Sequence, residues 1–448
     1  MVEAAVNALR RFGLGARPGE IAAIKDDPLG YLVSQIRPDA VGLFDGAGLT
    51  SDAAWQQQRD YIDAVSAIRK SASSGTAKPV LPKNPAFIIY RKDALARTRQ
   101  AIMAPNGLAE RMAAFWSGHF CISEKREHVR GIAGAYEREA IRSNVFGRFA
   151  ELLVAVVQHP AMLSYLDNLR STGPNSPAGK RLDRGINENL AREILELHTL
   201  GVDGGYTQAD VTSFAKVLTG WTVASGNRPN GGQFVFNARM HEPGPITVLG
   251  RRYADMGEEQ GLGVLADIAR HPATARHIAT KLVRHFISQD APAATVAEVE
   301  AAFTKTDGDL AEVTKAVVRA KDSLTIAPRK VLPPYDLLVA SCRALDISPD
   351  DKFILGTLNN LGQRLWDVPS PQGWPEDDEY WAAPDALVER IDWVSKLAGF
   401  VSVDDVAGRG REVLGTSFRV ETEAAIARAE NRLQGIALLL LSSEFQRR

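Results

Sequence analysis

Apolar residues recur at spacings of three and four along most of this chain, and this helical periodicity constrains the fold more than any other feature of the sequence. With 45% hydrophobic and 24% charged residues, the composition is that of a globular protein with a large core. The pattern predicts an all-α fold, and the length allows either two or three domains or a single large helical domain over residues 1–448. The predicted helical regions are 53–69, 89–104, 107–117, 130–157, 187–200, 208–218, 257–286, 294–319, 334–345, 383–398 and 420–442.

Strand-like alternation is confined to one part of the chain. Residues 231–238 (GGQFVFNA) and 246–253 (ITVLGRRY) are the best candidates, and we expect them to pair as a small β-hairpin insertion over 231–253. Residues 70–85 and 170–185 are rich in Ser, Gly and Pro, which predicts flexible loops. The second of these precedes a dense group of polar residues, so it is either a lid over a site or a surface insertion.

The charge balance excludes some classes of partner. The 53 basic and 54 acidic residues leave a net charge of −1, which argues against nucleic-acid binding. No stretch approaches the roughly 18 apolar residues of a membrane span, and the first residues lack a signal peptide. We expect a cytoplasmic protein, or a periplasmic or secreted one if its N-terminus has been trimmed. The two cysteines, Cys121 and Cys342, lie in apolar or helical contexts typical of buried thiols.

Residues 185–205 (GINENLAREILELHTLGVDGG) gather carboxylates, amides, an arginine and a histidine around one predicted helix. Glu188, Arg192 and Glu196 are successive (i, i+4) neighbours, which is typical of a surface helix with weak ion pairs. Apolar residues cover much of the remaining circumference. This favours instead a buried helix, whose carboxylates must be paired or have raised pKa values. Spacing alone leaves both interpretations open.

Other polar residues lie at the ends of predicted helices and in connections. Thr207 and Asp210 have the spacing of a capping box and predict the start of the helix over 208–218. His119 follows Trp116 at the end of another predicted helix, and His241 lies in the HEPGP connection. Each histidine is either a packed structural residue or part of a site.

A tryptophan-rich segment over residues 365–393 (LWDVPSPQGWPEDDEYWAAPDALVERIDW) combines aromatic rings with prolines and acids. Trp393 is in helical register and is expected in the core. Trp374 and Trp381 lie in a Pro/Gly-rich part, where a large ring is typical of a surface that binds a ligand or partner. Flat rings beside carboxylates suit sugars. The alternative is a loop that its tryptophans fix to the core.

Several motifs, in this order, resemble a large bacterial family of proteins, domain-of-unknown-function family 1800. The motifs are LGARPGE (14–20), ERMAAFWSGHFCIS (110–123), MLSYLDN (162–168), GINENLAREILELHTLGVDGGYTQADV (185–211), HEPGPITVLG (241–250), HPATARHIATKLVRHF (271–286), PSPQGWP (369–375) and LLLSSEFQRR (439–448). The resemblance implies a mostly helical single unit, often exported alongside a secreted partner, although no export signal is visible here. The polar residues of these motifs are Trp116, His119, Asp167, Asn168, Asn187 through Glu193, Glu196, His198 and His241. Their spread over five segments predicts convergence on one cleft.

The first functional hypothesis is a hydrolase that cleaves a carbohydrate by carboxylate general acid/base chemistry. Such cleavage needs a protonated carboxyl as acid and an ionised carboxylate as nucleophile or base. The candidate carboxylates are Asp167, Glu188 and Glu193, and the candidate orienting groups or alternative bases are His119, His198 and His241. The candidate residues for binding a small molecule or glycan are Trp116, Asn168, Asn187, Asn189, Arg192, Trp221, Trp374 and Trp381.

The alternative hypothesis is a non-catalytic binding or structural protein, whose tryptophan-rich segment contacts a glycan or a partner protein. We expect no cofactor and no metal, because the sequence has neither an HExxH nor a CxxC motif. If a cation did bind, His119, His198 and His241 would be its ligands, with Glu193 or Asp167. The absence of a GxSxG or Walker motif argues against serine hydrolase and nucleotide chemistry.

Overall fold

Helices occupy most of the chain, as the periodicity predicts. The structure is a computed structural model that describes residues 2–72, 80–126, 128–224 and 230–448. The helices of the first half are α1 (Val2–Asn7), α2 (Glu20–Ile24), α3 (Pro28–Ser34), α4 (Ser51–Ala72), α5 (Pro85–Met103), α6 (Gly107–His119), α7 (Ala133–Tyr136), α8 (Phe149–Gln158), α9 (Pro160–Tyr165), α10 (Pro177–Leu182), α11 (Asn189–Glu193) and α12 (Gln208–Val217). Those of the second half are α13 (Glu258–Ala269), α14 (Pro272–Phe286), α15 (Ala293–Lys305), α16 (Leu310–Arg319), α17 (Pro334–Leu345), α18 (Asp351–Asn360), α19 (Asp378–Trp381), α20 (Pro384–Gly399), α21 (Val406–Leu414), α22 (Val420–Ala427) and α23 (Arg432–Leu441). The all-α class is confirmed.

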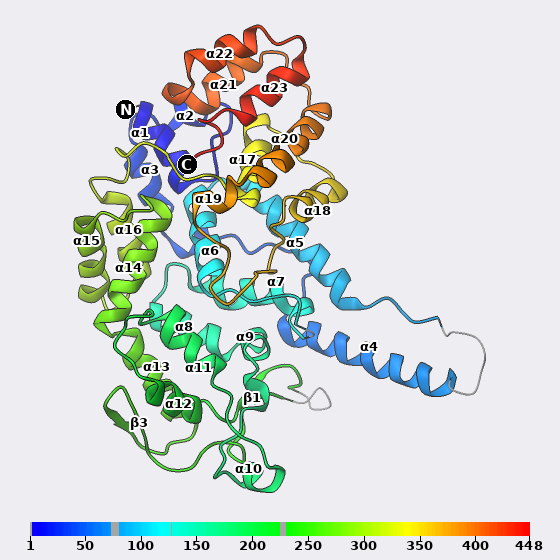
Figure 1. Cartoon of the computed structure of the whole chain (residues 1–448), viewed down its shortest axis with the longest axis vertical. Helices are drawn as coiled ribbons and strands as arrows, with labels where there is room; N and C mark the ends of the chain where they lie inside the picture. Colours follow the sequence, from blue (N-terminus) through cyan, green and yellow to red (C-terminus); the bar gives the residue numbers. More distant parts are fainter. Residues whose placement is uncertain (1, 73–79, 127, 225–229) are drawn as a thin grey trace.

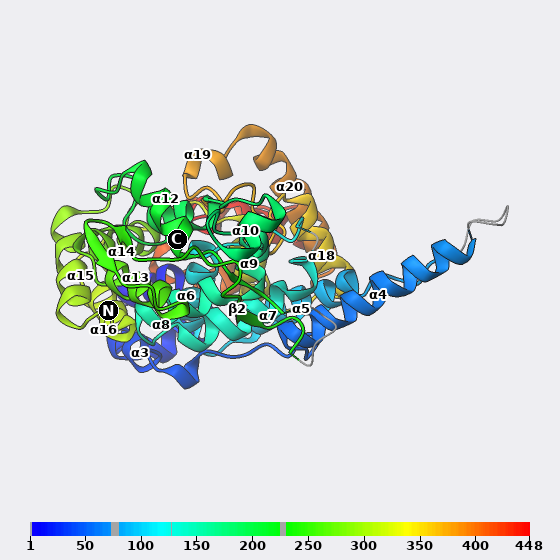
Figure 2. The same cartoon turned by 90° about the horizontal axis from the view of Figure 1, so that it is seen from below.

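The helices are arranged around α6, which lies near the middle of the molecule (Figure 1). Helices α14, α15 and α16 pack against one another along one side. Helices α20 to α23 gather at one end, where α23 packs against α20, α21 and α22. Helix α4 projects away from the body in both views (Figures 1 and 2). One continuous set of buried apolar side chains, from Ala5 to Phe445, connects these groups and agrees with a single domain.

The β structure among the described residues consists of two antiparallel pairs, and its pairing differs from the predicted hairpin. Strand β2 (Phe234–Phe236) pairs with β1 (Trp221–Val223), while β3 (Ile246–Val248) pairs with β4 (Arg251–Tyr253). The predicted pairing of 231–238 with 246–253 was therefore wrong. Leu249 and Gly250 both have positive φ, at 49° and 74°, so residues 246–253 fold back on themselves through a tight turn.

The two segments predicted as flexible loops differ in how much of them is described. Residues 73–79 of the first segment lie outside the described residues. The second segment contains α10, whose N-cap residue is Ser176; the serine hydroxyl accepts a hydrogen bond from the Gly179 amide. Backbone hydrogen bonds to Arg239 and Met240 hold it against the chain that follows β2. Their flexibility stays a prediction.

The polar helix predicted over 187–200 forms over residues 189–198, with one irregularity. Helix α11 continues as a π-helical turn over Ile194–His198, and the chain leaves the helix before Gly201, whose φ is 87°. The capping box of Thr207 and Asp210 is confirmed at the start of α12, with both side-chain-to-backbone bonds present.

The last residues of the chain return to the centre of the molecule. Arg447 pairs with Val331 in an isolated bridge, and the backbones of Arg448 and Lys330 exchange hydrogen bonds of 2.8 and 3.1 Å. This pairing places the Arg448 side chain beside α6 and α17. Separately, no helix in the described ranges is long and apolar enough to cross a membrane.

Candidate functional site

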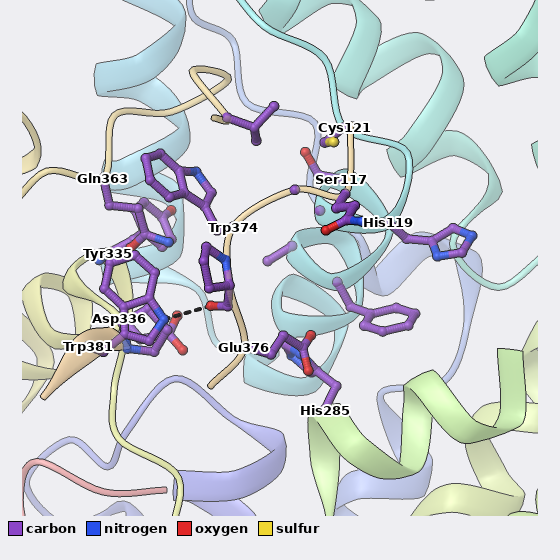
Figure 3. A pocket seen from close by; sticks show the side chains of 18 of the residues that line it. Ser117, His119, Cys121, His285, Tyr335, Asp336, Gln363, Trp374, Glu376 and Trp381 are labelled. Carbon is purple, nitrogen blue, oxygen red and sulfur yellow. Dashed lines mark hydrogen bonds and ion pairs between the residues drawn. The ribbon is translucent and has the colours of Figure 1, made fainter. Parts of the chain in front are cut away.

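A cavity of about 740 Å³ lies between α6, α14, α17 and the segment over residues 363–381, which we call the tryptophan loop. Ser117, His119 and Cys121 come from the end of α6 and the residues after it, and they form one wall of the cavity, which we call the α6 wall (Figure 3). Trp374 and Trp381 lie on the other side of the space. A cavity of this size matches those that hold small ligands.

Close packing against the end of α6 fixes the tryptophan loop. Gly373 has a φ of 88°, and a Cβ at this position would lie 3.0 Å from the carbonyl oxygen of Gly118. The thiol of Cys121 donates to the Pro371 carbonyl at 3.2 Å. Only glycine allows both this conformation and this approach without strain. The loop therefore follows one path over the cavity.

Polar contacts fix both ends of the tryptophan loop. Near its start, Asp367 forms an ion pair with Lys125 at 2.9 Å. Near its end, the Glu376 carboxylate accepts from His285 at 3.0 Å and contacts Lys330 at 3.2 Å. Asp378 accepts from the Val331 amide at 2.8 Å. These contacts join the loop to α14 and to the segment before α17.

Trp374 and Trp381, two of the three tryptophans of the loop, have different roles in the cavity. Trp381 is buried, and its Nε1 donates to the Pro375 carbonyl at 2.8 Å. Trp374 is half-buried and packs against Trp381, with ring centroids 5.9 Å apart. Within the described part of the chain, the Trp374 Nε1 has no hydrogen-bond acceptor. Trp374 thus offers a ligand both a flat apolar face and a donor.

Positive side chains outnumber their counterions around the cavity. Arg111 and Arg448 share a single carboxylate, Asp336, at 2.8 and 3.4 Å. Lys281, on α14, also lines the space, but no described residue forms a hydrogen bond or ion pair with its amine. Burial lowers the pKa of the Lys281 amine, and the Glu376 carboxylate offsets part of that shift.

A group of neutral histidines lies behind the α6 wall. The His119 ring is 6.1 Å from that of His198 and 6.3 Å from that of His277, and its Nε2 lies 3.1 Å from the His198 carbonyl oxygen. Burial is the main cause that lowers the pKa of His198 to about 3 and that of His277 to about 4. Burial also keeps the pKa of His119 well below its usual value. These rings are uncharged at neutral pH.

The structure does not bring the six predicted catalytic residues into one cavity. Of these residues, His119 is the one that lines the large cavity described above. His241 lies beside the β strands, where its Nδ1 is 3.0 Å from the Thr219 carbonyl oxygen and its Nε2 is 4.0 Å from Asp255. The convergence of His119, His198 and His241 on one cation is therefore not found. No group of three or more His, Cys, Asp or Glu in the described residues is placed to hold a metal ion.

The predicted carboxylates occupy two different environments. Glu188 is partly exposed and forms surface bonds with Arg192 at 2.9 Å and Thr212 at 2.6 Å. Glu193 is half-buried, and burial followed by the charge of Glu196 raises its pKa. One helix thus combines the two interpretations left open by its sequence: Glu188 belongs to a solvated face and Glu193 to a partly buried one.

Asp167 and Glu193 lie in the same region around Tyr165. Asp167 is exposed, has a left-handed φ of 58° and forms an ion pair with Arg126 at 3.4 Å. Burial, the Cys121 thiol and Glu193 raise the pKa of the buried Tyr165 phenol, and Arg126 acts in the opposite sense. Because Cys121 also lines the cavity, this region adjoins the α6 wall.

The predicted ligand-binding residues also divide into two groups. Trp374 and Trp381 line the cavity. The others have structural surroundings. Trp116 and Trp221 are fully buried in the core, and Asn168 is buried with its amide donating to the carbonyls of Leu218 and Trp221. Asn189 is exposed at the first residue of α11, and its amide donates to the side chain of half-buried Asn187, two residues earlier; Arg192 is half-buried near the end of α11.

Sequence reasoning did not identify Lys281 or Glu376 as site residues. Lys281 lies in the quoted motif HPATARHIATKLVRHF, four residues after His277 and four before His285. That spacing places a lysine between two histidines on one face of α14, beside the buried Ile278 and Leu282. The sequence feature that could have identified Lys281 is its position at the edge of the apolar stripe of this helix.

These features define the class of protein: a helical protein with a large cavity lined by basic and aromatic side chains. Comparison with protein families gives a match over residues 7–447, nearly the whole chain, to the family described as "Protein of unknown function (DUF1800)". The protein belongs to this family, which confirms the resemblance seen in its motifs. Comparisons with curated proteins and with solved structures gave no match.

Proposed function

We propose that this protein binds a saccharide in the cavity beneath the tryptophan loop. The observation that carries the proposal is Trp374, a half-buried ring on a fixed loop that faces a cavity of about 740 Å³ with its Nε1 donor unpaired among the described residues. Sugar rings present C–H faces that pack on indole, and their hydroxyls accept and donate hydrogen bonds. Ser117, Gln289 and Gln372 add polar groups to the same lining.

The fixed path of the loop also supports a binding role. A loop that is already held by Gly373, Asp367 and Glu376 loses little conformational freedom when a ligand arrives, so more of the contact energy appears as affinity. The exposed lining residues Arg284, Gln289 and Asp377 mark where a ligand would enter.

The test is a binding screen with wild-type protein and Trp374→Ala. Tetrasaccharides of glucose, xylose and galacturonic acid are titrated, and tryptophan fluorescence and calorimetry are followed. We expect one of them to bind and Trp374→Ala to weaken that binding at least tenfold, since a stacked aromatic anchor contributes roughly 2 kcal/mol or more.

Phe400→Ala is the matched control, because Phe400 is a large aromatic residue that is 78% exposed and does not line the cavity. It should bind like wild type. Absence of binding by every sugar in the screen, or equal affinity of wild type and Trp374→Ala, would overturn the proposal.

Hydrolysis of the bound saccharide is a second candidate function, and one observation favours it. Burial and Glu196 raise the pKa of Glu193, and Asp167 is ion-paired with Arg126, so two carboxyl groups in different surroundings lie near Tyr165, next to the α6 wall. Acid/base cleavage of a glycoside uses two carboxyl groups of this kind.

A further inference from the structure

Among the described residues, none forms a hydrogen bond or an ion pair with the Lys281 amine, and the Glu376 charge that acts on it already contacts Lys330. Lys281 lies on α14 and lines the cavity. A charged amine in a partly dry environment is costly unless an anion neutralises it. A lysine kept in this position therefore points to an anionic ligand.

Glu376 and Asp336, two carboxylates that line the cavity together with Lys281, already have partners. Both oxygens of Glu376 are used, one by His285 and the other by Lys330. Asp336 accepts from Arg111 and also faces Arg448. Each of these carboxylates therefore already has a basic partner other than Lys281. The lining thus combines an unpaired lysine with arginines that share one counterion.

Resting on the saccharide site proposed above, we propose that the ligand is an acidic saccharide whose anionic group is bound by the Lys281 amine while a sugar ring packs on Trp374. Lys281 and Trp374 line the same cavity, so one ligand of a few sugar units reaches both. The anionic group is a carboxylate or a sulfate, since either offers several oxygens to an ammonium. Exposed Arg284, one turn after Lys281, adds positive charge on the side where the ligand enters.

The experiment compares an acidic saccharide with its uncharged ester. Tetragalacturonate is titrated by calorimetry against its full methyl ester, which keeps the sugar rings but removes the charges. A third ligand is a tetrasaccharide of neutral sugars that carries sulfate groups. Its binding shows whether the protein recognises a sulfate or a carboxylate. We expect an acidic form to bind roughly ten- to hundredfold more tightly than the uncharged one.

The same titrations are repeated with Lys281→Met. We expect this variant to bind the acidic and the uncharged sugars with equal affinity. Compared with wild type, its affinity should fall for the acidic sugar and stay the same for the uncharged one. Lys352→Met is the control, because Lys352 is exposed on α18 and makes the same change in net charge. It should keep the full preference for the acidic sugar.

Thermal melting separates ligand recognition from a structural role. Because the Lys281 ammonium is unpaired in the described structure, Lys281→Met should melt at or above the wild-type temperature. Clear destabilisation would instead assign the lysine to the fold. Equal binding of acidic and uncharged sugars by wild type would overturn this inference and leave the saccharide site standing. Binding of none of the sugars would overturn both.

Discussion

Replacing Glu137 by glutamine should destabilise the protein strongly, because this carboxylate is fully buried between several donors. Its oxygens accept from Arg97 Nε at 2.8 Å and from Arg142 Nε at 3.0 Å. Ser117 and Trp366, which both line the cavity, donate to the same carboxylate at 2.9 and 3.0 Å. Glu137 thus connects the α6 wall to the tryptophan loop.

The size of the effect follows from the charges that the variant leaves unpaired. Arg142 keeps Glu110 as a partner, but Glu137 is the one carboxylate that pairs with Arg97 among the described residues. Removing one partner of a buried ion pair costs about 3–5 kcal/mol. The pKa of Glu137 gives a similar figure. Opposed by burial, Arg97 and Arg142 lower it from 4.5 to about 2, which corresponds to about 3 kcal/mol.

Differential scanning calorimetry or circular dichroism measures this loss as a fall in melting temperature. At about 2.1 cal/mol/K per residue, a chain of 448 residues has an unfolding entropy of about 0.9 kcal/mol/K, so Glu137→Gln should melt about 3–5 °C below wild type. The control is Glu188→Gln, whose exposed pair with Arg192 contributes about 0.5 kcal/mol at most. It should melt within about 1 °C of wild type.

The pH dependence gives an independent check with a defined sign. The folded pKa of Glu137 is depressed, so its stabilising effect is fully present above about pH 4.5 and is lost as the pH falls toward about 2. The difference in melting temperature between wild type and Glu137→Gln should therefore shrink across this window. A difference that is below 1 °C at pH 7, or that stays constant down to pH 2, would refute the reasoning.

Two further predictions concern the α6 wall and the region beside it. If the bound saccharide is hydrolysed, Glu193→Gln should lower the hydrolysis rate at least about a hundredfold while leaving ligand affinity intact; an unchanged rate in a product assay by chromatography would remove Glu193 from the chemistry. Burial raises the pKa of both Cys121 and Cys342 to about 12, so a thiol reagent at pH 8 should label neither cysteine in the folded protein and both after unfolding; rapid labelling of the folded chain would contradict their burial.

The sequence predicts the helices well because they depend on local spacing. The capping box of Thr207 and Asp210 and the end of the polar helix before Gly201 follow from neighbouring residues, and the structure has both. The strand pairing depends on a turn that the sequence does not mark clearly. Leu249 adopts a positive φ, which is uncommon for leucine, and this conformation turns residues 246–253 into their own hairpin.

The cavity is harder to predict because its walls come from distant parts of the chain. Gly118 and Gly373 meet closely although they are far apart in sequence, and neither residue alone indicates a site. Periodicity shows which residues share a face of α11 but not what covers that face. It therefore did not show that Glu188 is more solvated than Glu193. The same limit hid Lys281, since a lysine beside an apolar stripe has the same spacing whether it reaches solvent or a cavity.

The most direct test of the account is a crystal structure of the protein with tetragalacturonate bound. We expect the sugar in the cavity beneath the tryptophan loop, with one ring against Trp374 and a carboxylate within hydrogen-bonding distance of the Lys281 Nζ. A saccharide bound elsewhere on the molecule, with this cavity filled by solvent alone, would contradict the central claim.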